Sequence, residues 1–210
     1  MSKKRVVLVS VLLLAAALLL AFSRLGGFKL IAGPLEPGKI EEKNEGGYYK
    51  FEISRIYAIF AEGESQNEKA AARYAVVPYD GRLLAIRFPE RYFDSVDEII
   101  SGSGGCLGGG NTEGKYIVVY GSLQNCREDL LSLMNTWIEK NKKALYSLEL
   151  IEDSSDMEKI RYSKMLLVDT VNGVDETFAA VASIAALLLT AISAALILSG
   201  RKKTQTKIKR

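Results

Sequence analysis

The stretch YAVVPYDGRLLAIRF, residues 74–88, decides the fold class of this chain. Its two apolar runs flank Asp80-Gly81, a dipeptide that favours a two-residue hairpin turn because both turn positions need positive φ. Pro78 has no backbone N–H, so we expect the first arm to end there or to lie at a sheet edge. The sequence therefore predicts an antiparallel hairpin at this point.

Further strands are indicated on either side of the hairpin. Apolar residues alternate along 49–59, with Arg55 as the exception, and this pattern is typical of one half-buried strand. A continuous apolar run, 116–120, ends at Gly121 and predicts a buried strand, and residues 165–168 indicate a final one.

Two amphipathic helices are indicated between these strands. Pro89 suits the first position of a helix, and the apolar residues behind it recur at helical spacing. Asn125 and Glu128 have capping-box spacing, which predicts the start of a second helix. The apolar stripes consist of Tyr92, Phe93, Val96, Ile99 and Ile100 in the first helix and Leu130, Leu131, Met134, Trp137 and Ile138 in the second. We expect an α+β fold with a mostly antiparallel sheet over residues 48–170.

An apolar segment stands at each end of the chain. Residues 6–23 follow a basic N-terminus, and residues 178–199 carry no charge and precede a basic tail. Both predict transmembrane helices, and because basic residues stay in the cytoplasm, both termini are expected inside and residues 24–177 outside. The first segment is also compatible with a signal peptide cleaved after Ser23. The remaining parts are a cytoplasmic N-terminus (1–5), connectors (24–47 and 171–177) and a cytoplasmic tail (200–210).

Charge is distributed very unevenly. The two ends hold nine of the 28 Lys and Arg residues and none of the 25 carboxylates, which leaves a net charge of −6 in the middle of the chain. An acidic domain argues against nucleic acid as a partner, because phosphate neutralisation dominates that binding. The expected partners are the lipid bilayer and another membrane or envelope protein.

Small residues recur at i, i+4 in the second apolar segment and allow helix backbones to approach closely. Alanine as a neutral filler explains the same composition. The candidate packing residues are Ala179, Ala182, Ser183, Ala186, Ala191 and Ala195.

Several classes of catalytic and binding site are excluded or disfavoured. The chain has no histidine, so it has no Ser-His-Asp triad, Cys-His pair or His-ligated zinc. The glycine-rich stretch 101–110 lacks the Lys-Ser/Thr ending of a P-loop and predicts a connector, so no cofactor is expected. Acidic residues cluster near the C-terminal part of the domain, where a solvated turn is favoured over a calcium site. They are Glu149, Glu152, Asp153, Asp156 and Glu158.

Cys106 and Cys126 are the two cysteines. Outside the cytoplasm they could pair, and closing a loop of this length would contribute about 3 kcal/mol. Two unpaired thiols are the alternative, and a position in the first turn of a helix would lower the thiol pKa of Cys126.

The hairpin, together with Tyr116-Ile117-Val118-Val119-Tyr120-Gly121 and the amphipathic helix that follows, resembles an uncharacterised bacterial family. The family's members carry one span at each end of an extracytoplasmic α+β domain, and the resemblance implies no activity and no site residues. We expect a non-enzymatic module that binds a partner at the cell envelope. The alternatives are an envelope hydrolase or transferase that uses Asp and Glu alone, and a structural subunit of a membrane complex.

Overall fold

The computed structural model describes residues 3–38, 40, 47–64, 70–102, 115–147, 149, 151, 156–171, 174–189 and 191–192. The chain divides into two compact units, one made of residues 1–32 and 174–210 and the other of residues 33–173. We describe each unit by itself.

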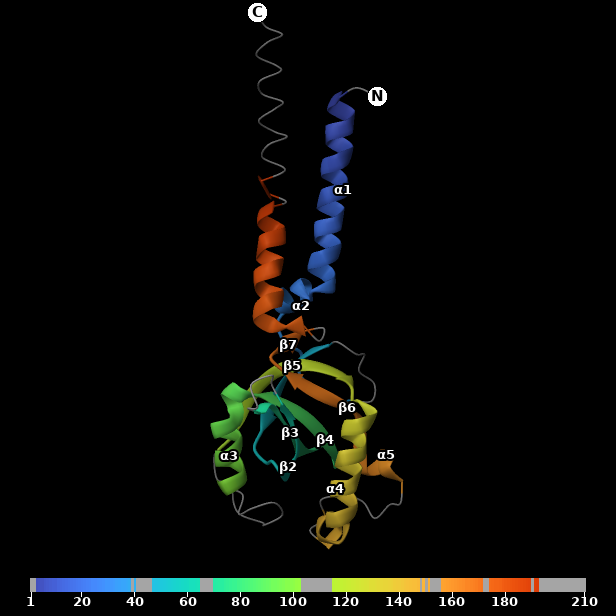
Figure 1. Ribbon diagram of the computed structural model, residues 1–210, viewed down its shortest axis with the longest axis vertical. Coiled ribbons are helices and arrows are strands. Elements are labelled where there is room, and N and C mark those ends of the chain that lie inside the picture. Colours follow the sequence, from blue (N-terminus) through green and yellow to red (C-terminus); the bar gives the residue numbers. More distant parts are fainter. Residues whose placement is uncertain are drawn as a thin grey trace, which may run out of the picture. The chain divides into compact units, whose positions relative to one another are not determined.

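The unit of residues 33–173 contains a six-stranded sheet with the order β1-β5-β6-β4-β3-β2 (Figure 1). Its strands are β1 (Tyr48–Ile53), β2 (Ala58–Glu64), β3 (Ala70–Tyr79), β4 (Arg82–Pro89), β5 (Ile117–Asn125) and β6 (Arg161–Val168). Four neighbouring pairs are antiparallel, and β4 with β6 is parallel. The sheet is therefore mixed, and the predicted α+β class is confirmed.

The predicted hairpin is confirmed at its turn. Tyr79 pairs with Arg82, and Asp80 (φ 47°) and Gly81 (φ 73°) both have the positive φ that the turn needs. Strand β3 continues through Pro78, although β3 is an interior strand. This is tolerated because the β2 ladder reaches only as far as Val76, so the missing N–H of Pro78 lies beyond it.

The predicted strand 49–59 is two strands that lie at opposite edges of the sheet. Residues 54–57, which include Arg55, connect β1 to β2. The five Cα–Cα steps of this connection span at most about 18 Å, whereas the outer strands of a flat six-stranded sheet lie about 24 Å apart. The sheet must therefore curl. Ile56 is buried with Phe51 in one core cluster, so the connection crosses on the face that this cluster covers.

A helix packs on each face of the sheet (Figure 1). Helix α3 (Phe93–Gly102) contributes Val96 and Ile99 to one hydrophobic cluster, and α4 (Glu128–Ser147) contributes Leu130, Met134 and Ile138 to the other. Alternate residues of the hairpin strands point to alternate faces, so Ile86 joins the first cluster and Ala85 the second.

The helix starts differ slightly from the predicted ones. Pro89 is followed by a 3₁₀ turn, η2 (Glu90–Tyr92), before α3 begins at Phe93. Asn125 is the last residue of β5, and α4 begins at Glu128, so the predicted capping box does not form. A short helix, α5 (Met157–Ile160), precedes β6, and two-residue strands β7 (Thr170–Val171) and β8 (Val174–Asp175) follow it.

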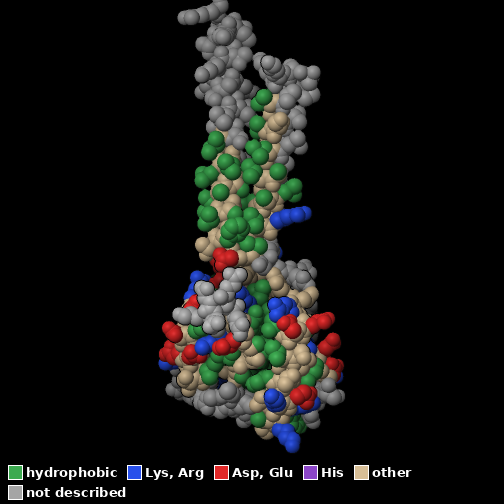
Figure 2. Space-filling model, in the orientation of Figure 1, with side chains coloured by type: hydrophobic (Ala, Val, Ile, Leu, Met, Phe, Trp, Pro, Cys, Tyr) green, Lys and Arg blue, Asp and Glu red, His purple; other side chains and the backbone are tan. Residues whose placement is uncertain are grey.

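The described part of the other unit contains helices and the two-residue strand β8. Helix α1 (Lys3–Arg24) leads into α2 (Gly27–Ala32), and the rings of Phe22 and Phe28 meet edge to face at 4.7 Å. The Asp175 side chain accepts a hydrogen bond from the Phe178 N–H at 2.9 Å and so caps the helix over 176–189. Figure 2 shows hydrophobic side chains over the described parts of both long helices.

In the described part of the chain, no helix is both long enough and apolar enough to cross a membrane.

This finding contradicts the predicted membrane spans at 6–23 and 178–199. It also contradicts the membrane location inferred from them, in which residues 24–177 lie outside the cytoplasm and both termini lie inside.

Candidate functional site

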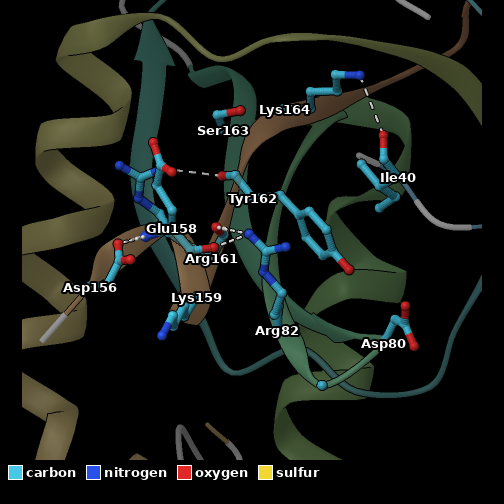
Figure 3. A pocket seen from close by; sticks show the side chains of 11 residues that line it. Ile40, Asp80, Arg82, Asp156, Glu158, Lys159, Arg161, Tyr162, Ser163 and Lys164 are labelled. Carbon is cyan, nitrogen blue, oxygen red and sulfur yellow. Dashed lines mark hydrogen bonds between the residues drawn. The ribbon is translucent and has the colours of Figure 1, made fainter. Parts of the chain in front are cut away.

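A pocket of about 720 Å³ lies at the end of the sheet where the hairpin turns (Figure 3). Three segments of the 33–173 unit form it: the β3–β4 turn, the stretch from α5 into β6, and the single residue Ile40. The lining residues are Ile40, Asp80, Gly81, Arg82, Asp156, Glu158, Lys159, Arg161, Tyr162, Ser163 and Lys164.

Local sequence fixes the wall made by α5. Asp156 is the N-cap residue, and its carboxylate accepts a hydrogen bond from the Glu158 N–H at 3.0 Å. Arg161 takes up an extended backbone directly after the helix and begins β6. The wall therefore changes from helix to strand within one residue, and the strand carries Tyr162 and Lys164 along the pocket.

Arg82 joins the hairpin turn to this wall. Its guanidinium Nη2 donates to the Glu158 carbonyl and, at 3.1 Å, to the Arg161 carbonyl. The same guanidinium lies 4.3 Å from the centroid of the Tyr162 ring, a cation–π contact. In Figure 3, Arg82 occupies the centre of the view between the helix end and the ring.

Arg161 is a buried cation, 8% exposed. Its Nε donates to Asn135 Oδ1 of α4 at 2.6 Å, and its Nη1 donates to the Tyr162 carbonyl at 3.3 Å. Burial lowers the pKa of its guanidinium, and the neighbouring charge of Arg82 acts in the same direction. The side chain ties β6 to α4 and so supports the pocket from behind.

Two tyrosines near the pocket differ in what their hydroxyls do. Tyr79 donates to the carbonyls of Pro37 at 2.5 Å and Gly38 at 3.2 Å. Tyr162 is 4% exposed and its ring lies 6.3 Å from that of Tyr79, yet its hydroxyl makes no hydrogen bond with any described residue. Burial raises the pKa of both phenols, and the Asp80 charge raises them further.

The rim of the pocket carries charges of both signs. Asp80, Glu158 and Lys159 are exposed. Lys164 is half-buried, and its Nζ donates to the Ile40 carbonyl at 3.3 Å, which holds that residue against the pocket. The pocket therefore presents similar numbers of basic and acidic side chains to a ligand.

The structure places the predicted cysteine site only in part. Cys126 lies between β5 and α4, ahead of the observed helix start at Glu128 and not in its first turn as predicted, and is 8% exposed. Burial raises its thiol pKa, which is opposite to the predicted lowering. Cys106 lies outside the described residues, so the disulfide stays a prediction.

The predicted small-residue face falls within the unit of residues 1–32 and 174–210. Ala179, Ser183 and Ala186 are buried there and Ala182 is half-buried, whereas Ala191 is exposed. Ala195 lies outside the described residues. The four inward positions recur at i, i+3, i+4 and i+7, so they occupy one side of the helix.

The predicted acidic cluster contributes Asp156 and Glu158 to the pocket, while Glu152 and Asp153 lie outside the described residues. Among the described side chains no group of three or more His, Cys, Asp or Glu could hold a metal ion. Most of the glycine-rich stretch, 103–110, is also outside the described part.

Sequence reasoning missed Arg82 and Tyr162, the pair at the centre of the pocket. Neither belongs to a motif, because 80 positions of sequence separate them and only the parallel pairing of β4 with β6 brings them together. The one usable signal was Asp80-Gly81, which fixes where the strand carrying Arg82 begins.

Comparison with known proteins gives a family and no function. No curated protein and no solved structure matches the chain. A family described as a domain of unknown function, DUF8577, matches residues 1–199 of the 210, and nothing in that description identifies a membrane-protein family. The expected resemblance to an uncharacterised family is thus confirmed in its general form. The chain belongs to the DUF8577 family.

Proposed function

We propose that residues 33–173 form a non-catalytic binding module and that its partner binds in the pocket beside Arg82 and Tyr162. The observation that carries the proposal is the pocket itself. Its volume of about 720 Å³ falls in the range of ligand-binding sites, about 300–1,000 Å³, and rigid strands and a capped helix form its walls.

The chemistry of the lining supports binding rather than catalysis. Histidine is absent from the whole chain. The Arg82 guanidinium is engaged with backbone carbonyls, the Arg161 guanidinium with Asn135, and the Asp156 carboxylate with the start of α5. These charged groups hold the walls in place, and a general acid or base needs a proton free to move.

The competing function is a hydrolase that uses carboxylates alone. It is favoured by the three carboxylates that line the pocket, those of Asp80, Asp156 and Glu158. The amides Asp80→Asn and Glu158→Gln separate the two functions, because they remove proton transfer and retain hydrogen bonding. Under the proposal, both variants keep the partner.

Site-specific photo-crosslinking of the full chain in its own host tests the proposal. A photoreactive amino acid at Lys159, on the exposed rim, should give a discrete adduct. The matched control is the same amino acid at Lys140, which is exposed on α4 and does not line the pocket. Equal adducts from both positions, or none from position 159, would contradict the proposal.

A further inference from the structure

The Tyr162 hydroxyl belongs to a buried side chain that lines the pocket. The residue is 96% buried, since only 4% of it is exposed, and buried hydroxyls are normally hydrogen-bonded. Among the described residues the oxygen has no hydrogen-bond partner, and it is not one of the solvent-inaccessible side-chain atoms that lack one. It therefore remains accessible from the pocket that the side chain lines.

The direction of the side chain agrees with this. Figure 3 shows the Tyr162 ring running from β6 into the pocket, with its hydroxyl toward the side on which Asp80 lies. The ring cannot rotate out of this position without losing the Arg82 guanidinium at 4.3 Å and its contact with the Tyr79 ring. The hydroxyl is thus a fixed group that presents one donor and one acceptor site to a ligand in the pocket.

The surroundings of the hydroxyl restrict the class of ligand. Asp80 and Glu158 disfavour an anion, and Arg82, Lys159 and Lys164 disfavour a cation. An uncharged, dipolar group satisfies both signs at once. A sugar ring is one such ligand, but sugar sites use an open aromatic face for stacking, and Arg82 covers the face of Tyr162. A peptide main chain needs no such face.

We infer that the pocket binds a segment of peptide main chain from the partner and that the Tyr162 hydroxyl hydrogen-bonds one of its amides. This inference rests on the proposed function and names its ligand class. The hydroxyl supplies a single neutral hydrogen bond, so its loss weakens binding by about twofold to tenfold.

Tyr162→Phe and Tyr79→Phe form a matched pair for the test. Tyr162→Phe keeps the ring, the cation–π contact and the fold, so the melting temperature of the full chain stays unchanged while the adduct yield from position 159 falls. Tyr79→Phe removes the bonds to Pro37 and Gly38, so it lowers the melting temperature. The inference is overturned if Tyr162→Phe leaves the adduct yield intact. A different result contradicts the proposed function itself: equal adduct yields from the photoreactive amino acid at positions 159 and 140.

The ligand class is tested with defined probes on the wild-type chain labelled with [ζ-¹³C]tyrosine, in which the signal missing from Tyr162→Phe identifies Tyr162. N-acetyl-triglycine N-methylamide at millimolar concentrations should shift that signal and saturate, while inorganic phosphate and glucose leave it in place. A shift with phosphate or glucose in place of the peptide would overturn the inference, as would no shift with any of the three.

Discussion

The guanidinium of Arg82 lies 4.3 Å from the centroid of the Tyr162 ring and at the same time donates to the Arg161 carbonyl at 3.1 Å. One side chain thus closes the distance between the hairpin turn and the start of β6. Because β4 and β6 run parallel, no turn joins them. At the pocket the Arg82 side chain links the start of β4 to the start of β6.

Replacing Arg82 should therefore destabilise the fold. Arg82→Ala removes a cation–π contact and two hydrogen bonds, which together contribute about 1–3 kcal/mol to the free energy of unfolding. Arg82→Lys should recover only part of this loss, since an ammonium cannot match the planar contact. Urea unfolding measures both. The control is Arg127→Lys, whose exposed pair with Asp129 should leave the midpoint unchanged.

Gly121 should not tolerate a side chain. A Cβ at this position would overlap the carbonyl oxygen of Leu167 on the neighbouring strand β6, and backbone cannot move aside cheaply. We expect Gly121→Ala to cost about 3 kcal/mol or more in thermal or urea unfolding. At Gly63 an added Cβ would meet Tyr74 at an ordinary 3.4 Å. If Gly63→Ala destabilised the chain as much as Gly121→Ala, the close approach of β5 and β6 would be wrong.

Cys126 should be unreactive in the folded chain. Burial raises its thiol pKa, so less of it is thiolate at neutral pH and reagent cannot reach it. In a Cys106→Ser background, Ellman's reagent should modify Cys126 far more slowly than it does after unfolding in urea. Equal rates in the folded and unfolded chain would show that the thiol is exposed.

Stability should fall in strongly alkaline solution. Burial raises the pKa of the phenols of Tyr49, Tyr57, Tyr79, Tyr92 and Tyr162 above their usual value of about 10. The unfolded chain then loses these protons at lower pH than the folded chain. The stabilisation is complete below about pH 10 and is lost as pH rises through the folded pKa values.

Absorbance at 295 nm measures this directly. In the folded chain, the signal of these five phenols should appear in a late phase that coincides with unfolding. A single phase near pH 10 with the fold intact would contradict the burial of these phenols.

Local signals in the sequence were sufficient for the hairpin and for the two helices that cover the sheet. Asp80-Gly81 predicts a hairpin turn because these two residues alone supply the positive φ angles that the turn needs. The apolar stripes of α3 and α4 likewise state which side of each helix is buried. The turn and the helices depend on residues that are close together in the sequence, so they can be predicted from the sequence.

The sheet order and the pocket depend on contacts between distant segments. Nothing in residues 49–59 shows that β1 and β2 lie at opposite edges, since both halves have the same alternation. The pairing of β4 with β6 could not be read either, because parallel strands share no turn. Arg82 and Tyr162 come into contact only because β4 pairs with β6. No sequence motif contains both residues, so the centre of the pocket could not be predicted from motifs. The membrane prediction, which rested on apolar length and on the basic residues beside each segment, is wrong for the described helices.

Filling the pocket tests the central claim most directly. Ser163 is exposed and lines the pocket, so Ser163→Trp should occupy the space that the partner uses, while Ser132→Trp adds the same side chain to the exposed side of α4. With the photoreactive amino acid at Lys159 in each full-length chain, the quantity to measure is adduct yield. The account predicts that Ser163→Trp abolishes the adduct and Ser132→Trp preserves it, with both chains folded by circular dichroism. An undiminished adduct in folded Ser163→Trp would contradict the claim that the partner binds in this pocket.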